Sequence, residues 1–346
     1  QVRLFTQLLF GIREQLCSTS GFLRLFHDAA KRAVVEFLGD ERDSQVVLHR
    51  RLAAYFGDLD RCKTDEEKAE MRARQVRELP YHLAGAEDFD RLAHFLAGAE
   101  VMEVMLNDES SKYELVAYWR DVESHWHRKH SSEAQVCSQT GRPTTGAEAY
   151  LQAVAKEVEA SIGGVGALRS IDADSDLRAK AVQAANHLGA LSTLLVLLSL
   201  YDGAVAVRQV EITFNTALYG QVHDKVSVSC SELASVYERV YCKYEVSMEL
   251  MTRALEIDRE LYGEENRQLA VGYDNLAGLH LKMGNYKDAE EMFGKSLAIK
   301  QKICGQTHRD VAHTACSLGL LCEELGRFAE ADKWYKMGLD IRKQAF

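Results

Sequence analysis

The stretch NLAGLHLKMGNYKDAEEMFGKSLAIKQKICG, Asn275 to Gly305, is followed by a near copy of itself, SLGLLCEELGRFAEADKWYKMGLDIRKQAF, Ser317 to Phe346. Apolar, small and glycine residues recur in the two stretches 42 positions apart. The matched pairs are Leu276 and Leu318, Gly284 and Gly326, Tyr286 and Phe328, Ala289 and Ala331, Phe293 and Tyr335, Leu297 and Leu339, and Ile299 and Ile341. A fixed period of about 20 to 50 residues predicts a stack of similar structural units.

The repeat extends towards the N-terminus. Residues that match the second half of the unit lie another 42 positions upstream, at Tyr244, Met251, Leu255, Ile257 and Gly263. Leu233 lies 43 positions before Leu276, which we attribute to one extra residue in the helix before Tyr244. A fainter copy lies 43 positions further upstream, at Tyr201, Ala204, Ile212, Phe214 and Gly220. The pattern predicts about four units, of which the first is degenerate.

Each unit reads as one helix, a short turn at Gly284 or Gly326, and a second helix, so that the apolar faces are buried only when units stack. The chain has only two prolines, Pro80 and Pro143, and proline breaks helix interiors. We therefore expect an all-α fold: a helical arm followed by an α-solenoid over residues 186–346.

The solenoid resembles the tetratricopeptide repeat in its long form, as found in kinesin light chains and nephrocystin-3-type proteins. The phrases that carry the resemblance are YGQVHDKVSVSCSELASVY, YGEENRQLAVGYDNLAGLH and CGQTHRDVAHTACSLGLLC. His223 and His308 match a histidine of the family pattern, whereas Asn266 departs from it, and no unit keeps the proline that follows.

The triplet Gly294-Lys295-Ser296 spells the end of a P-loop. A P-loop needs another glycine five positions earlier and a preceding strand, but residue 289 is alanine and the triplet falls inside a predicted second helix. We therefore expect no nucleotide site here, no cofactor and no enzymatic activity in this chain.

The formal charge of −10 argues against nucleic-acid binding, which depends on Lys and Arg. The eight cysteines show no C-x-x-C pair, so we expect neither a disulfide scaffold nor a zinc framework, and reduced thiols indicate the cytoplasm. The longest apolar run, residues 188–200, is shorter than the roughly 18 residues of a membrane span, and we read it as a buried helix.

Residues 21–130 do not repeat. Residues 20–125, roughly, resemble the winged-helix and helical arm that follows the nucleotide-binding domain in NACHT-type signalling ATPases, and we expect such an arm over residues 1–130. The carriers of this resemblance are His49, Leu52, Tyr55, Phe56, Arg77, Glu78, Leu79, Pro80, Tyr81, His82, Leu83, Tyr113, Leu115, Tyr118, Trp119 and Arg120. It implies an ATPase domain before Gln1. We expect linker and adaptor helices over residues 131–185.

Two polar clusters suggest metal sites but fit simpler roles. His125, His127 and His130 have Arg128 and Lys129 between them, so a solvated helix end explains them better. Asp172, Asp174 and Asp176 have the spacing of a calcium loop but lack its glycine and glutamate, and helix capping explains them better.

Tetratricopeptide arrays present the first helices of their units on a concave face, so resemblance to them implies a groove that binds peptides. The positions expected to face that groove are Glu232, Ser235, Glu238, Arg239, Asp274, Asn275, Lys282, Ser317, Glu323 and Glu324. Among the kinesin-light-chain type, an asparagine in each unit holds the peptide backbone. Asn275 keeps it, whereas Glu232 and Ser317 replace it in the neighbouring units.

The expected function is a non-catalytic protein-interaction scaffold. Resemblance to nephrocystin-3-type proteins implies a role in ciliary assembly and Wnt-related signalling, with inversin-like and kinase partners. Three alternatives stay open: the regulatory sensing arm of a NACHT-type ATPase, a motor cargo adaptor of the kinesin-light-chain type, and an array that only packs against a neighbouring domain.

Overall fold

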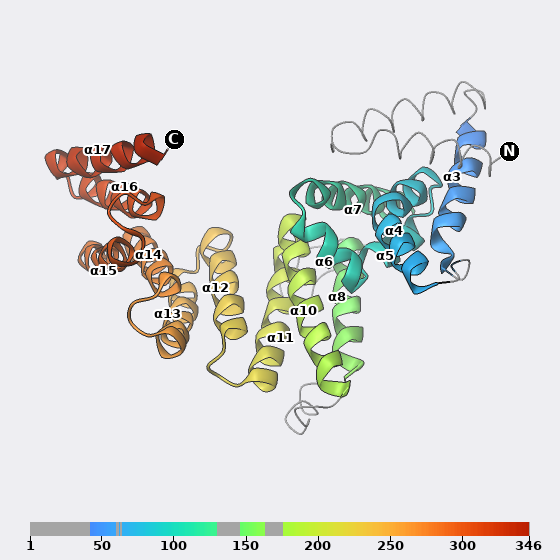
Figure 1. Ribbon diagram of the computed structural model, residues 1–346, viewed down its shortest axis with the longest axis horizontal. Helices are drawn as coiled ribbons and strands as arrows, with labels where there is room; N and C mark the ends of the chain where they lie inside the picture. The colour runs from blue at the N-terminus through green and yellow to red at the C-terminus, as the bar shows by residue number, and fades with distance from the viewer. Residues whose placement is uncertain (1–41, 60–61, 63, 130–145, 163–175, 346) are drawn as a thin grey trace. The chain divides into compact units, whose positions relative to one another are not determined.

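The computed structural model describes residues 42–59, 62, 64–129, 146–162 and 176–345, which form α-helices joined by turns, without a β-strand in these ranges (Figure 1). The expected all-α fold is confirmed. The chain divides into two compact units, Gln1–Leu96 and Ala97–Phe346.

The first compact unit contains α3 (Arg42–Gly57), α4 (Asp65–Gly85) and α5 (Phe89–Leu96). Helix α4 begins with a capping box, in which the Thr64 hydroxyl accepts the Glu67 N–H and the Glu67 carboxylate accepts the Thr64 N–H. His82 of α4 stacks on Phe56 of α3 at 5.5 Å between ring centroids and lies 3.0 Å from His49. Several residues that carry the arm resemblance therefore pack together.

The second compact unit begins with α6 (Ala99–Asn107), α7 (Glu109–Lys129) and α8 (Gly146–Ala160). Trp119 of α7 is fully buried. Glu123 of α7 accepts the backbone N–H groups of Gly146 and Ala147, and so caps the first turn of α8. Both α6 and α8 pack against the first helix of the repeats.

Four antiparallel helix pairs follow within residues 176–345 (Figure 1). They are α10 (Asp176–Leu197) with α11 (Tyr201–Tyr219), α12 (Asp224–Arg239) with α13 (Tyr244–Tyr262), α14 (Arg267–Lys282) with α15 (Tyr286–Cys304), and α16 (Arg309–Glu324) with α17 (Phe328–Ala345). We call these pairs units 1 to 4. The second helix of each unit packs against the first helix of the next, which is the stacking that the sequence period predicts.

The turn inside each unit uses one residue in the left-handed region, with φ of 62° at Ser199, 51° at Cys242, 76° at Gly284 and 70° at Gly326. This conformation disfavours side chains, which explains the glycines of units 3 and 4. The expected extra residue in the helix before Tyr244 is wrong in its location. Helices α12 and α14 both have 16 residues, and the extra residue lies in the turn 240–243.

The junctions between units share one device at the start of the next helix. His223 Nδ1 accepts the N–H of Lys225 at 3.2 Å, and His308 Nδ1 accepts the N–H of Asp310 at 3.2 Å. Asn266 departs from the histidine pattern but does the same work, because its side-chain oxygen accepts the N–H of Gln268 at 2.7 Å.

Small residues let the paired helices approach closely, and large ones fill the space between units. Ala277 and Ala289 are fully buried in one apolar cluster with Phe293 of α15 and Leu318 of α16. A methyl group added at Gly319 would lie 2.7 Å from the Tyr335 ring, so the contact between α16 and α17 depends on glycine at this position.

Candidate functional site

Helices α12, α14 and α16 line the inner face of the stack. Helices α14 and α16 touch one another directly although they belong to different units. Lys282 of α14 donates a 2.6 Å hydrogen bond to Glu238 of α12, and Arg267 of α14 donates a 3.0 Å bond to Asp310 of α16. In a curved stack, the helices that meet across units lie on the inside of the curve. We call the solvent-facing side of these three helices the inner face.

Exposed and half-buried side chains of the inner face form four rows, because the repeat places one residue from each helix at the same height. The rows are Val228, Val271 and His313; Glu232, Asn275 and Ser317; Ser235, Gly278 and Leu320; and Arg239, Lys282 and Glu324. Within each helix these positions are three or four residues apart, which places them on one side of the helix.

Seven of the ten residues expected at the groove belong to these rows, namely Glu232, Ser235, Arg239, Asn275, Lys282, Ser317 and Glu324. The other three, Glu238, Asp274 and Glu323, precede row residues by one position and turn towards neighbouring helices. Glu238 binds Lys282, Asp274 binds Lys300, and Glu323 accepts a 2.9 Å hydrogen bond from the Tyr335 hydroxyl. Their side chains therefore hold the inner face together.

Asn275, Arg239 and Glu324 are the row side chains most available to a ligand. All three are exposed, and none has a hydrogen-bonding or ionic partner within residues 42–59, 62, 64–129, 146–162 and 176–345. A side-chain amide offers donors and an acceptor, which is the complement of a peptide backbone. Asn275 lies in the central helix of the inner face, with Val271 one turn before it.

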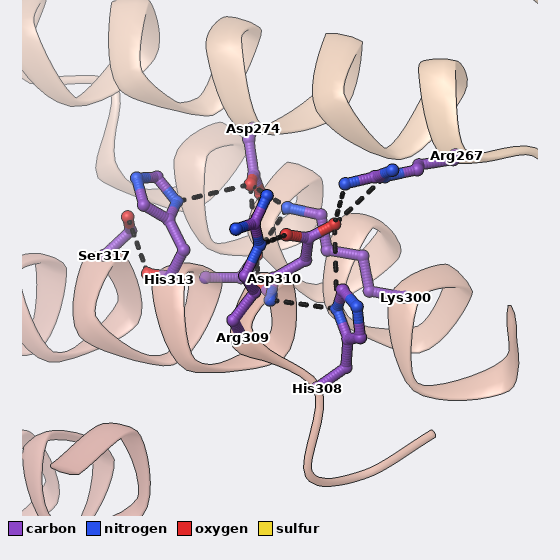
Figure 2. Close-up of polar contacts among 9 residues, drawn as sticks. Arg267, Asp274, Lys300, His308, Arg309, Asp310, His313 and Ser317 are labelled. Carbon is purple, nitrogen blue, oxygen red and sulfur yellow. Dashed lines mark hydrogen bonds and ion pairs between the residues drawn. The ribbon is translucent and has the colours of Figure 1, made fainter. Parts of the chain in front are cut away.

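A buried ion pair is formed by Asp274, the residue that precedes Asn275 in α14 (Figure 2). The Lys300 ammonium of α15 binds the Asp274 carboxylate of α14, and both side chains are at most 10% exposed. Lys300 also donates to the Thr314 hydroxyl of α16 at 2.9 Å, and that hydroxyl donates to Asp274 at 3.0 Å. His313 lies 3.8 Å from the same carboxylate on its exposed side. Three helices from two units are thus joined behind the inner face.

A second buried network joins units 1 and 2. The Arg208 guanidinium of α11 lies 2.6 Å from Glu211 and 2.7 Å from Glu232 of α12. Ser229 donates to Glu211 at 2.8 Å, and the Asn215 amide donates to Ser229 at 3.2 Å. Burial raises the pKa of Glu211, although Arg208 and Ser229 act in the opposite direction. Glu232 is therefore a member of an ion network, in the place where Asn275 stands free one unit later.

Unit 4 carries a further titratable contact on the same side. Burial and the neighbouring Glu323 carboxylate raise the pKa of Tyr335 to about 12. The Tyr335 hydroxyl stays protonated at neutral pH and continues to donate to Glu323. This bond fixes a carboxylate at the edge of the inner face.

Sequence reasoning missed the apolar part of the inner face. Val228, Val271 and Leu320 are 54%, 45% and 44% exposed, and Gly278 has open space where a side chain would stand. The repeat offset could have found them, because they occupy the same rows as the polar residues that were predicted. Only polar residues were predicted to face the groove, so these positions were omitted.

The other candidate motifs lie in helices. Gly294, Lys295 and Ser296 lie inside α15, which confirms the helical interpretation, and Lys295 pairs with Glu291 at 2.6 Å. His127, near the end of α7, lies 2.9 Å from Glu123.

Further candidates fall partly outside the described residues. Asp176 is the first residue of α10, whereas His130, Asp172 and Asp174 lie outside the described ranges. Six cysteines, of the eight in the chain, are described, and all six are free thiols.

Comparison with known proteins defines the class of the repeats. The tetratricopeptide repeat family profile matches residues 227–302 and again 269–344, which span units 2 to 4. This part of the chain is therefore an all-α solenoid of tetratricopeptide repeats, as its periodicity predicts. Among the described helices, none combines the length and the apolar character that a membrane span requires.

Particular relatives are more distant. The RxLR effector protein SFI4 of Phytophthora infestans (strain T30-4) is 27% identical over 123 residues, which are 34% of this chain. The match covers 36% of that protein, little more than a third of its length.

Two solved structures resemble the chain in the path of the backbone. BtubC (BKLC) from P. vanneervenii has a TM-score of 0.46 and 17% identity, covering 74% of this chain and 92% of its own. A Podosopora anserina putative kinesin light chain with nearly identical TPR-like repeats has a TM-score of 0.43 and 15% identity, covering 57% of this chain and 89% of its own. Likeness at this level does not identify a function.

Proposed function

We propose that the inner face of α12, α14 and α16 binds an extended segment of a partner protein and that the chain acts as a non-catalytic interaction scaffold. The observation that carries this proposal is the free side chain of Asn275. It stands exposed in the central helix of this face, where Lys282 is paired with Glu238 and Asp274 is paired with Lys300. A peptide backbone in front of α14 would give the Asn275 amide the donor and acceptor partners that it lacks.

The surroundings of Asn275 suit a peptide in two ways. Val228, Val271 and Leu320 provide exposed apolar area for the side chains of a ligand, beside the hydrogen-bonding position. Behind Asn275, the bonds among Asp274, Lys300 and Thr314 fix the helix that presents it. A preorganised surface loses little conformational entropy on binding, which favours affinity.

The mixed charges of the inner face support selective binding rather than general attraction to one charge. Arg239 and Lys282 lie at one end of the rows, with Glu324 at the equivalent position in unit 4. A ligand therefore meets the unpaired positive charge of Arg239 in unit 2 and the unpaired negative charge of Glu324 in unit 4, whereas Lys282 of unit 3 is paired with Glu238. Reversal of Arg239 should change which peptides bind more than it changes the stability of the stack.

The test blocks the inner face without unfolding it. Peptides that bind the folded wild-type chain are first selected from a displayed random library. Calorimetry then measures their affinity for the wild type and for Gly278→Tyr. Gly278 has open space around it, so a tyrosine there protrudes into the proposed site. Gly294→Tyr, in α15 and equally free of neighbours, is the matched control. We expect loss of binding in Gly278→Tyr alone and at least a tenfold loss in Asn275→Ala; binding unchanged in both would refute the inner face as the site.

Finer proposals depend on the motif resemblances alone. Residues 1–130 resemble a NACHT-type arm, residues 131–185 would be linker and adaptor helices, and residues 186–346 would be the binding module. Resemblance to nephrocystin-3-type proteins supports a cytoplasmic and ciliary scaffold in Wnt-related signalling with inversin-like and kinase partners. Imaging of the tagged protein in ciliated cells tests this, and its absence from cilia would remove the ciliary role without affecting peptide binding.

A further inference from the structure

The turn from α15 to α16 brings three metal-binding side chains together. The Cys304 thiol, the His308 imidazole and the Asp310 carboxylate have ligand atoms that all lie within 4.8 Å of one another, and all three residues are half-buried. Within the part of the chain that the structure describes, this is the one such group of three. Sulfur, nitrogen and oxygen donors together are typical of zinc rather than of magnesium or calcium.

The distances are close to those of a tetrahedral site. Zinc bonds of roughly 2.0 to 2.3 Å place two ligand atoms of a tetrahedron about 3.3 to 3.8 Å apart. His308 Nδ1 already lies 3.7 Å from Asp310 Oδ2. The Cys304 thiol would have to move by about 1 Å at most to complete three corners, and water would supply the fourth.

The hydrogen bond made by His308 suits a metal at the same nitrogen. Its Nδ1 accepts the N–H of Asp310 at 3.2 Å, so the lone pair is on this nitrogen, on the side of the Asp310 carboxylate. A metal bound at Nδ1 would replace this long hydrogen bond, and Cys304 would release its thiol proton to solvent on binding. The thiolate and the carboxylate together would balance the charge of a divalent ion.

Two arginines surround Asp310 in different ways (Figure 2). Arg267 of α14 holds Oδ2 through Nε at 3.0 Å and Nη2 at 2.8 Å, and so orients the carboxylate. Carboxylates that bind metals are commonly oriented by hydrogen bonds from neighbouring side chains, and Arg267 supplies such bonds to the oxygen that also faces His308. Arg309 lies 3.7 Å from Oδ1 but is 78% exposed, and it is free to turn into solvent when a cation enters.

The repeat itself shows that the fold does not require these three residues. The equivalent junction between units 1 and 2 has Tyr219, His223 and Lys225, and the junction between units 2 and 3 has Tyr262, Asn266 and Gln268. Tyr219 stacks on His223 with 4.2 Å between ring centroids. The thiol occurs at one junction only. The junction between units 1 and 2 also has a carboxylate, because Asp224 lies 2.6 Å from His223 Nδ1, but it has tyrosine in place of the thiol.

We propose that Cys304, His308 and Asp310 bind a zinc ion at the junction of units 3 and 4. The ion would fasten the end of α15 to the start of α16, and through Arg267 it would also restrain α14. This inference is independent of the proposed peptide site. Zinc would stabilise the folded array in proportion to its binding, because the unfolded chain does not hold the three ligands together.

Cobalt is the probe, because Co²⁺ replaces Zn²⁺ and is coloured. We expect the reduced chain to bind one Co²⁺, with a thiolate-to-cobalt absorption band and the intense visible bands of tetrahedral cobalt, all lost when Zn²⁺ is added. The repeats supply conservative variants: Cys304→Tyr carries the residue of Tyr262, and His308→Asn carries the residue with which Asn266 caps α14. Both should keep the fold and weaken Co²⁺ binding more than tenfold, and Cys304→Tyr should also abolish the thiolate band.

Two controls make the result decisive, because the chain has eight cysteines and twelve histidines that could bind metal adventitiously. Cys242→Ser removes an exposed thiol elsewhere and should leave the spectrum unchanged. Zn²⁺ should raise the melting temperature of the wild type and of Cys242→Ser, but not that of Cys304→Tyr. A thiolate band that survives in Cys304→Tyr, or a wild type that binds Co²⁺ no more tightly than the two variants, would overturn the proposal.

Discussion

Lys300 and Asp274 form a largely buried ion pair between α15 and α14, with side chains 4% and 10% exposed. Each neutralises a charge that would otherwise be buried alone. Lys300→Met should therefore lower the free energy of unfolding by about 3 kcal/mol, because it leaves Asp274 uncompensated. Urea denaturation measures this change.

The matched control is Lys295→Met, in the same helix but with its partner Glu291 in solvent. It should change the free energy of unfolding by less than about 0.5 kcal/mol. Asp274→Leu combined with Lys300→Met should recover much of the loss, since no charge is then buried. If the double variant were as unstable as Lys300→Met, packing rather than charge would be responsible.

The capping side chains at the junctions give a second prediction. Asn266→Ala should lower the free energy of unfolding by about 1 kcal/mol, because the N–H of Gln268 loses its acceptor. Asn266→Ser and Asn266→Asp keep an acceptor and should cost only a few tenths of that amount. Equal destabilisation by all three variants in thermal unfolding would show that the cap is not the cause.

Replacement of glycine by alanine should change the free energy of unfolding in opposite directions at two positions of unit 3. Gly284 has φ of 76°, so Gly284→Ala should destabilise the fold by about 1 to 2 kcal/mol. Gly294 lies inside α15 with free space around it, so Gly294→Ala should stabilise the fold by roughly 0.5 to 1 kcal/mol. Chemical denaturation of both variants checks the pair, and the same sign at both would contradict the assignment of turn and helix.

Glu211 predicts a pH dependence. Burial raises the pKa of Glu211 above its ordinary value of 4.5, so the folded state holds this proton more tightly than the unfolded state. The resulting stabilisation is fully present below the unfolded pKa and is lost as the pH rises through the folded pKa. The free energy of unfolding of the wild type, relative to that of Glu211→Gln, should therefore fall as the pH rises from about 4.

Glu291 is the control with the opposite sign. Its hydrogen bond from Lys295 lowers the pKa of the Glu291 carboxyl group, so its contribution is present above the unfolded pKa and is lost in acid. The free energy of unfolding of the wild type, relative to that of Glu291→Gln, should therefore fall as the pH falls below the unfolded pKa of Glu291. A flat profile for Glu211→Gln against the wild type would mean that the Arg208 network compensates the burial of Glu211 completely.

The helix pairs were predictable because their information is local and repeated. Gly284 and Gly326 mark turns, and the apolar residues recur with the period of a stacked unit. The extra residue of the turn 240–243 was placed in the preceding helix, because neither an added turn residue nor the positive φ of Cys242 changes the apolar pattern. Asn266 was seen as a departure from the family phrase, although in chemical terms it does the same work.

The polar groups behind the inner face were not predictable in the same way. Lys300 reads as an ordinary charged residue of an amphipathic helix, and only its distance to Asp274 and Thr314 shows that it is buried. Asp274 was expected to face a ligand, yet the packing of three helices directs it inward. Cys304, His308 and Asp310 match no common zinc spacing, so the sequence analysis expected no zinc site.

Arg208 occupies the repeat position of Met251 and Phe293, which are apolar core residues in units 2 and 3. Its charge is paired with Glu211 in its own unit and with Glu232 in the next unit. When the units of an array are interchangeable, any unit can pack against any other. A buried arginine makes the contact with one particular neighbour more stable than the contact with any other unit. Unit 1 therefore packs best against unit 2. A chain with its units permuted should lose stability first at the contact between these two units.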